Sequence, residues 1–598
     1  MTRNPLLESP DAPPCDYDRA PEYDGMIEAR DVVVPMRDGV DLSVDIYRPD
    51  SPARFPALLA FSIYNKDLQG PDVAASLPAQ PAWGPLWAGL LEAGDTRFLV
   101  SRGYVHVIGS PRGVGKSGSG GSREWDCYDL IEWIARQPWC DGNVGMVGIS
   151  GFGAEQLAVA KLQPPSLKAI FPFDPRGAYG PFGGFREEYP GGVIHTFRYL
   201  IGHFSAFHQD RGAPTQLSPE REALWAAAVR NPDYRQYPHI FNVVAQKGQH
   251  MPAYFDLLID PFDRVAWVEN SEAEFARVKV PTYTGSGWYG YTYKTHLNGA
   301  QSWFANLSCP RRLLLTGPAH LERPFHTMHA ELLRWYDHWL KGIDTGIERE
   351  PPVKFWVMGE NRWRTAQHWP LPDTQWTKLY LNSWERLSAR PFTPASVDDT
   401  IPPDTFVQMP PTQTAQIARL RYMTQPLSQD TLIAGPIVLN LFAAIDQDDT
   451  NWIAVLKDVG PDVSVQSARE GERSVPADLP EREVTRGWLK ASMRAVDQKR
   501  SKPGRPWHPL TRASRAPVEP GEIAEYAIEI MATANMFRRG HRICLDICAA
   551  DMATGIGGAT NAEYVPYHIC SARTVVHTIY HDTSRPSHLL LPVVPAEM

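Results

Sequence analysis

The stretch from Asp141 to Ala160 reads DGNVGMVGISGFGAEQLAVA, and Ser150 lies in its middle. The first half has the apolar character of a buried strand, the last half is typical of a helix, and glycines crowd the bend between them. A buried strand that leads directly into a helix is one half of a strand–helix–strand unit. This stretch therefore predicts a parallel sheet covered by helices, with the serine at a strand-to-helix corner.

The flanking segments continue the same alternation. Two alternating strands surround the turn at Arg37–Gly39, an apolar strand covers Ala57–Ser62, and RGYVHVIG is a further buried strand that enters a glycine-rich loop. Apolar residues at helical spacing predict an amphipathic helix over Cys127–Gln137, and LKAIFPFDP is another apolar strand. The alternation stops near residue 180 and returns with VKVPTYTGSGWY, RRLLLTGPAH and a closing amphipathic helix.

The chain is too long for one core, so several domains are expected. Short helical segments and aromatic residues between the strands predict an inserted helical cap. After residue 350, β-like runs separated by Pro, Gly and Asp predict an antiparallel sandwich or jelly roll. The predicted organisation is an irregular N-terminal arm (1–27), a sheet domain (28–178 and 276–348), a helical cap (179–275) and a C-terminal jelly-roll domain (349–598).

Composition narrows the classes of partner and compartment. A formal charge of −9 with no basic stripe argues against nucleic acid and anionic membranes as partners. No run of 18 apolar residues occurs, and the N-terminus has no apolar leader segment. The seven cysteines form no disulfide framework or zinc motif, which favours buried thiols in a reducing compartment. We expect a cytoplasmic protein with no metal and no cofactor, and homo-oligomerisation is compatible with the sequence.

Ser150 has two interpretations. A strand–turn–helix corner exposes the hydroxyl and places the N–H of Gly151 beside it, as a serine nucleophile needs. The alternative is that Ser150 only caps the helix that follows. The glycine usually found two residues after such a serine is replaced by Phe152, and the glycine falls at Gly153 instead.

The segment WCDGNVGMVGISGFG resembles the nucleophile segment of the cocaine-esterase and X-prolyl-dipeptidyl-peptidase group of α/β-hydrolases. MRDGVDLSVDIYRP resembles the opening strands of that family, and PGEIAEYAIEIMATANMFRRGHRICLDI resembles its jelly-roll domain. RGYVHVIGSPRGVGKSGSG resembles its Arg-Gly loop, with Ser110 where an Asp is usual. The resemblance extends over nearly the whole chain from about residue 28. It implies an α/β-hydrolase sheet domain with an inserted helical cap and a C-terminal β jelly-roll domain.

The resemblance also implies roles for individual residues. Ser150 matches the nucleophile, and Tyr64 in FSIYNK matches the tyrosine that completes the oxyanion hole with the N–H of Gly151. A phenolic hydroxyl is a suitable donor to a developing negative charge. His320 in GPAH matches the histidine base, whereas His329 and His338 are interpreted as surface or cap positions on the closing helix.

The family acid is missing. It is the Asp of a G-W-Y-D segment, and this chain has SGWYG there, so that the matching position is Gly290. Asp174, at the end of LKAIFPFDP, is one candidate replacement, and Glu322 is a weaker one. Asp174 could equally be a turn residue before Pro175. A Ser–His dyad is a further alternative, because triad loss leaves residual catalysis from the oxyanion hole.

The candidate cap and the loop after the penultimate sheet strand are rich in aromatic residues. We expect Trp288, Tyr289 and Phe152 to contact a small apolar or aromatic group, although most aromatic residues of a cap build its own core. The sequence thus predicts a serine hydrolase of the esterase or amidase type that acts on a small molecule through an acyl-enzyme. The alternatives are an acyltransferase or another non-hydrolytic enzyme on a natural-product substrate, and a catalytically weak binding protein.

Overall fold

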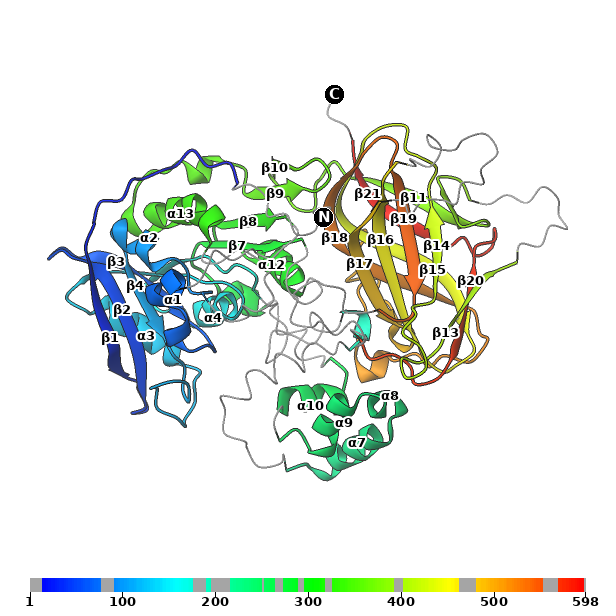
Figure 1. Ribbon diagram of the computed structural model, residues 1–598, viewed down its shortest axis with the longest axis horizontal. Coiled ribbons are helices and arrows are strands. Elements are labelled where there is room, and N and C mark those ends of the chain that lie inside the picture. The colour runs from blue at the N-terminus through cyan, green and yellow to red at the C-terminus, as the bar shows by residue number, and fades with distance from the viewer. Residues whose placement is uncertain are drawn as a thin grey trace.

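The computed structural model describes residues 13–76, 91–175, 190–194, 216–249, 252–263, 273–288, 295–317, 325–391, 402–461, 480–551 and 568–595. Within these ranges the chain forms a sheet domain, a small group of helices and a β-rich domain, which are seen as three bodies in Figure 1. No helix in the described ranges is both long enough and apolar enough to cross a membrane.

The first sheet has ten strands in the described part of the chain, in the order β1-β2-β4-β3-β5-β6-β7-β8-β9-β10. The strands from β4 to β9 pair in parallel, and β1, β2 and β10 are antiparallel to their neighbours. Their bounds are β1 Met26–Pro35, β2 Asp41–Pro49, β3 Phe55–Phe61, β4 Val105–Gly109, β5 Cys140–Met146, β6 Leu167–Ile170, β7 Thr282–Gly287, β8 Arg311–Thr316, β9 Val353–Val357 and β10 Arg362–Ala366.

Helices cover both faces of this sheet, as the sequence predicts. In β3, Leu59 packs into the hydrophobic cluster under one face and Leu58 into the cluster under the other, which explains why the strand is a continuous apolar run. The first cluster takes side chains from α3, and the second takes them from α2 and α13. The helices of this domain are α1 Pro71–Ser76, α2 Thr96–Ser101, α3 Asp126–Ala135, α4 Gly151–Ala160, α12 Thr295–Asn306 and α13 His329–Lys341, with 3₁₀ turns η2 Lys66–Leu68, η5 His326–Met328 and η6 Ile347–Arg349.

The described part of the N-terminal arm is irregular up to β1 and packs on α13. Tyr17 donates a hydrogen bond to Asp337 over 2.7 Å, and the Arg19 guanidinium pairs with the same carboxylate. Because Asp337 is fully buried, its charge needs such partners.

Helices follow between β6 and β7, where a helical cap is predicted. They enclose their own hydrophobic cluster, and Figure 1 shows them as a body beside the two sheets. Hydrogen bonds tie them to the β-rich domain: Cys570 N–H donates to the Tyr237 hydroxyl over 3.1 Å, and Ala572 N–H donates to Asp233 over 2.7 Å. The bounds are η4 Pro190–Gly192, α7 Pro219–Arg230, α8 Pro232–Arg235, α9 Pro238–Ala245 and α10 Pro252–Ile259.

The C-terminal domain is almost entirely β-structure. Its described residues form an eleven-stranded sheet, and an additional pairing of β15 with β21 joins two distant strands of the order, so that this part of the sheet closes on itself. The strands are β11 Gln375–Asn382, β12 Arg386–Ser388, β13 Asp404–Gln408, β14 Arg419–Met423, β15 Thr431–Ile445, β16 Asn451–Val459, β17 Glu481–Lys490, β18 Ala524–Phe537, β19 Arg542–Cys548, β20 Val575–Tyr580 and β21 His588–Val594, with 3₁₀ turns η7 Ala491–Met493 and η8 Arg512–Ser514. A β-rich domain is therefore present, and its jelly-roll topology stays a prediction.

The predicted boundary at residue 349 differs from the sheet topology. β9 pairs in parallel with β8, and β10 extends the same sheet, so residues 353–366 pair as strands of the first sheet. KFWVMG is a short apolar run, and such a run fits either sheet equally well. Only its long-range pairing decides to which sheet it belongs.

Candidate active site

Ser150 lies at the corner between β5 and α4 in a backbone conformation that side chains with a Cβ rarely adopt, with φ 57° and ψ −113°. It stands at the N-cap position of α4, but its side chain makes no capping hydrogen bond. A helix cap would use the hydroxyl for that bond. The structure thus favours the nucleophile interpretation over the helix-cap alternative.

Neighbouring backbone segments hold the corner in place. The Ser150 N–H donates to Phe173 O over 3.0 Å, and the Ile149 N–H donates to Glu92 O over 3.0 Å. A Cβ on Gly153 would lie only 2.5 Å from Phe173 O. The close approach of α4 to the segment after β6 therefore requires glycine three residues after the serine, which accounts for the unusual position of this glycine.

Tyr64 lies beside the first turn of α4. A Cβ on Gly151 would lie 2.6 Å from Ser62 Oγ and 3.2 Å from Tyr64 Cε2, so only glycine lets the tyrosine ring come this near. The first N–H groups of a helix have no partner within the helix. Ser150 and the N–H of Gly151 therefore lie beside the ring of Tyr64, the residue to which the family resemblance assigns the oxyanion role.

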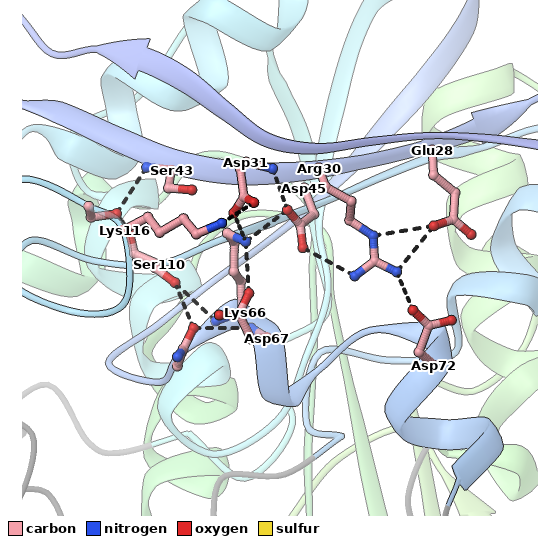
Figure 2. A network of polar contacts seen from close by, with 12 residues as sticks. Glu28, Arg30, Asp31, Ser43, Asp45, Lys66, Asp67, Asp72, Ser110 and Lys116 are labelled. Carbon is pink, nitrogen blue, oxygen red and sulfur yellow. Dashed lines mark hydrogen bonds and ion pairs between the residues drawn. The ribbon is translucent and has the colours of Figure 1, made fainter.

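A buried lysine anchors the loop that carries Tyr64. Lys66 is only 2% exposed, and its ammonium group lies 2.8 Å from carboxylate oxygens of three aspartates. Figure 2 shows this network between the loop after β3 and the strands β1 and β2, with Lys116 also paired to Asp31. The three aspartates around Lys66 are Asp31, Asp45 and Asp67.

The charges of this network stabilise one another. Burial by itself opposes the charge on Lys66, but the hydrogen bonds that the ammonium group donates to Asp31 and the other two carboxylates outweigh it, so the pKa of the lysine lies above its ordinary value. Hydrogen bonds from Lys116 and then Lys66 lower the pKa of Asp31 to about 2. Asp45, 1% exposed, gains a further ion pair with Arg30 at 3.7 Å. A buried charge with several partners fixes the loop in one position.

Ser110, at the position where the family usually has Asp, binds the same loop. Its hydroxyl accepts a hydrogen bond from Lys66 N–H over 3.0 Å and donates to Asn65 Oδ1 over 3.3 Å. Farther along the loop, Gln69 accepts a hydrogen bond from Glu92 N–H over 2.8 Å. Glu92 O in turn accepts from the residue before Ser150, so the tyrosine loop and the nucleophile corner are connected through the backbone.

Asp174 lies next to the nucleophile corner and next to β7. It is fully buried, and it follows directly on Phe173, to which Ser150 is hydrogen bonded. Its N–H donates to Gly285 O over 2.8 Å, and its carboxylate accepts a hydrogen bond from Ser286 over 2.6 Å. Its φ of 49° is unusual for a residue with a side chain. A turn residue at the surface would not be buried in this way.

Several predicted positions lie outside the described residues. These are the base His320, the weaker acid candidate Glu322, the substituted position Gly290 and the substrate-contact candidate Tyr289. Their roles stay predictions that follow from the family resemblance.

Two residues predicted to contact substrate are core residues instead. Phe152 is fully buried in the cluster beneath the sheet, where it packs beside Tyr64 with ring centroids 6.0 Å apart. Trp288 is also fully buried, its indole N–H donates to Trp356 O over 2.7 Å, and its ring lies 5.8 Å from that of Trp369. Both are large apolar side chains close to the catalytic segments in sequence, and sequence proximity does not reveal the direction of a side chain.

Lys66 and Ser286 are the residues that sequence reasoning missed. Lys66 follows Tyr64 by two positions in FSIYNK, just after a buried strand. Only this nearness to Tyr64 could have indicated that the lysine supports the site. Ser286 is one of several small residues in TGSG, and nothing in that pattern distinguishes it. Their partners are distant in sequence, so only the fold reveals their contacts.

Comparisons with known proteins identify the family of the chain. Residues 38–322 match the family described as X-Pro dipeptidyl-peptidase (S15 family), and residues 345–590 match the X-Pro dipeptidyl-peptidase C-terminal non-catalytic domain. Cocaine esterase from Rhodococcus sp. is 27% identical over 95% of this chain and 98% of its own length.

Solved structures show the same fold. A CocE/NonD family hydrolase from Staphylococcus aureus has a TM-score of 0.69 and 22% identity, covering 95% of this chain and 94% of that one. An α-amino acid ester hydrolase has a TM-score of 0.67 and 19% identity, covering 96% and 98%. The strained serine corner, the adjoining tyrosine and these likenesses lead to one conclusion. The chain is a serine hydrolase and belongs to the cocaine esterase and X-Pro dipeptidyl-peptidase family of α/β-hydrolases.

Proposed function

We propose that this enzyme hydrolyses an ester or amide of a small apolar or aromatic substrate through an acyl-enzyme on Ser150. The observation that carries the proposal is the strained corner at Ser150, whose hydroxyl makes no capping bond and which lies with Gly151 beside Tyr64. Strain of this kind costs on the order of 1–3 kcal/mol and persists where function maintains it.

The proposed chemistry combines these groups with His320, the base that the family resemblance implies. His320 takes the proton from the Ser150 hydroxyl as the oxygen attacks the substrate carbonyl carbon. The Gly151 N–H and the Tyr64 hydroxyl stabilise the negative charge that develops on the carbonyl oxygen. The protonated histidine then gives its proton to the leaving alcohol or amine. Water repeats the sequence on the acyl-enzyme, releases the acid and restores the serine.

We propose Asp174 as the carboxylate that serves His320. The missing family acid belongs at Gly290, only four residues after Ser286, and Ser286 donates its hydrogen bond to Asp174. Asp174 thus follows β6, and β6 pairs with β7, the strand after which the family supplies its acid. Its burial and the hydrogen bond from Ser286 are what an acid that orients an imidazole needs, because both restrict the carboxylate to one position.

The proposed substrate class rests on the names of two similar proteins and on the composition of one segment. Cocaine esterase and α-amino acid ester hydrolase are named for ester substrates, which favours an ester over a peptide here. The chain between residues 176 and 215 is rich in aromatic residues, which suits an apolar or aromatic group. The partner proposed is accordingly a small molecule.

A fluorophosphonate probe tests the nucleophile. We expect stoichiometric labelling of the whole enzyme at Ser150, found by peptide mass spectrometry, and no labelling of Ser150→Ala. 4-Nitrophenyl esters of acetate, butyrate and benzoate should then show a burst of nitrophenolate followed by turnover. Addition of a nucleophilic alcohol distinguishes hydrolysis from acyl transfer, because hydrolysis yields the free acid and transfer yields a new ester of the added alcohol. An unlabelled Ser150 in folded enzyme would overturn the proposal.

Substitution of Asp174 tests the acid. Asp174→Asn should lower kcat by about 10²–10⁴-fold with the fold intact, because a triad histidine without its carboxylate loses its orientation and charge stabilisation. Ser286→Ala is the matched control, which removes one hydrogen bond to Asp174 but keeps the carboxylate, and it should cost far less. Introducing Gly290→Asp into the Asp174→Asn variant should recover part of the loss. Unchanged turnover of Asp174→Asn would favour the Ser–His dyad.

A further inference from the structure

Three side chains with metal-binding atoms meet where the N-terminus of α2 faces the turn that precedes α13. Asp95 Oδ2 lies 3.6 Å from His326 Nε2 and 3.6 Å from His329 Nε2. One ligand atom from each of the three residues lies within 4.8 Å of the others. Asp95 is far from both histidines in sequence, so no motif indicates the cluster, and the sequence predicts no metal site.

The two distances from Asp95 suit one divalent ion. In a tetrahedral site, bonds of about 2.0–2.1 Å to nitrogen and oxygen place neighbouring ligand atoms about 3.4 Å apart. The distances from Asp95 Oδ2 to the two imidazole nitrogens exceed this by only a few tenths of an ångström. We propose that Asp95, His326 and His329 form a binding site for a Zn²⁺-like divalent metal ion. Water completes the coordination, because the chain supplies three ligands.

Two of the ligands are held in place before any ion binds. Asp95 uses Oδ1 to accept the Phe98 N–H over 3.1 Å as the N-cap of α2, which directs Oδ2 toward the histidines. The His329 ring stacks on Phe98 with centroids 3.8 Å apart and an angle of 19° between the planes. The same phenylalanine thus orients both ligands, and a preorganised pair needs little ordering on binding.

The third ligand gives the ion access from solvent. The His326 side chain is 63% exposed, whereas those of His329 and Asp95 are 19% and 21% exposed. The buried Phe325 precedes it with a φ of 75° and lies near Gly94, so the backbone of this turn is fixed against the segment before α2. Only the exposed ring has to rotate to close the site.

The site joins two elements of the sheet domain. Asp95 caps α2, and the histidines are the first residues of η5 and α13. A bound ion would link these elements with three coordinate bonds in place of two Asp–His contacts at 3.6 Å. Since only the folded chain presents the three ligands together, the ion should raise the thermal stability of the protein. This inference does not depend on the reaction assigned to Ser150.

Metal titration of the full-length enzyme tests the site. After removal of metals with a chelator, calorimetry with Zn²⁺ should show one site with a Kd in the micromolar range or below, and Zn²⁺ should raise the Tm. Co²⁺ should give the visible bands of a four- or five-coordinate ion without the intense near-ultraviolet absorption of a thiolate ligand. Strong thiolate absorption would overturn the assignment, because the cluster contains no cysteine.

Three variants make the test specific. Asp95→Asn preserves a good helix cap and removes the carboxylate, and His326→Ala changes an exposed side chain, so both should keep the metal-free Tm of the parent enzyme. Each should weaken Zn²⁺ binding more than about tenfold and abolish the rise in Tm. His338→Ala, on the same helix α13 but outside the cluster, should bind Zn²⁺ like the parent. No binding by the parent, or equal binding by all variants, would overturn the proposal.

Discussion

At the scale of single residues, Ser150 and Asp174 share an unusual feature. Both have positive φ, and they are linked because Ser150 N–H binds the residue before Asp174. Each such conformation costs on the order of 1–3 kcal/mol. Two neighbouring costs of this size are compatible with a stable fold only where the surrounding strands determine the backbone, as β5, β6 and β7 do here.

Tyr64→Phe tests the oxyanion hole. It keeps the ring that packs against Gly151 and Phe152 and removes only the hydroxyl. Since one oxyanion donor contributes about 2.7–4 kcal/mol to transition-state stabilisation, we expect kcat to fall about 10²–10³-fold with little change in KM or Tm. Steady-state kinetics with a 4-nitrophenyl ester measure kcat and KM, and a thermal melt measures Tm. If kcat stays within a factor of a few, Tyr64 packs at the site and does not donate.

At the scale of elements, the loop after β3 is built as a rigid arm. Lys66 fixes its base to β1 and β2, Ser110 binds its backbone, and Gln69 connects it to the segment that supports Ile149. Rigid supporting contacts of this type keep a catalytic donor within a few tenths of an ångström of its productive position. The network in Figure 2 is therefore expected to matter for turnover as well as for stability.

Lys66→Met measures that contribution. It leaves the buried Asp45 carboxylate without its 2.8 Å partner, and breaking a buried pair on one side costs about 3–5 kcal/mol. We expect a lower free energy of unfolding in urea, and a decrease in kcat larger than the change in KM. Lys116→Met is the matched control: it removes an exposed lysine from Asp31 and should cost about 0–1 kcal/mol with normal turnover. Equal effects of the two substitutions would contradict this account.

At the scale of the whole molecule, one hydrophobic cluster runs from the first sheet into the β-rich domain. It contains Trp288 from the end of β7, Leu315 from β8, Phe355 from β9 and side chains from most strands of the second sheet. The strands β7, β8 and β9 of the first sheet thus pack directly against the core of the C-terminal domain. The described domains are expected to depend on each other for stability, because separating them would expose this shared apolar surface.

Trp288→Ala distinguishes a core role from a substrate-contact role. Removing a fully buried indole and its hydrogen bond to Trp356 should lower the free energy of unfolding by about 3–5 kcal/mol. The KM of enzyme that remains folded at low temperature should change little. Trp288→Phe should have a smaller effect on stability, since it keeps much of the buried area. A large rise in KM with unchanged stability would instead show that Trp288 contacts the substrate.

Two buried histidines make both sheets sensitive to acid. Burial lowers the pKa of His106, on β4, to about 3, and it lowers the pKa of His577, on β20, to about 3 as well. An unfolded histidine titrates near pH 6.5. Between these values the unfolded chain binds a proton that the folded chain does not, so the stabilisation is complete above pH 6.5 and is lost as the pH falls toward 3.

Each histidine should therefore lower the free energy of unfolding by on the order of 1–2 kcal/mol between pH 6.5 and pH 5. Urea unfolding at both pH values, followed for the whole chain, measures the change. His577→Gln is the control: it can keep the 2.8 Å hydrogen bond with Thr450 and should make the decrease smaller. Stability that is constant from pH 6.5 to pH 5 would contradict the prediction.

The sequence by itself determined the parts that depend on local pattern. Alternating strand and helix signals predicted the parallel sheet, the glycines and apolar residues around Ser150 predicted the nucleophile corner, and the β-like runs after residue 350 predicted the β-rich domain. These features follow from period and backbone preference, which neighbouring residues share. The placement of Tyr64 beside Gly151 followed from the family resemblance, and the structure confirms that proximity.

Only the tertiary structure decided the rest. In the tertiary structure β9 and β10 pair with the first sheet, and the side chains of Trp288 and Phe152 are buried in the core. Asp174 accepts a hydrogen bond from Ser286, and three carboxylates lie around Lys66. Each of these depends on contacts between residues far apart in the chain. The direction of a side chain and the partner of a charge are set by packing and by the cost of burying unpaired polar groups, and a local pattern contains neither.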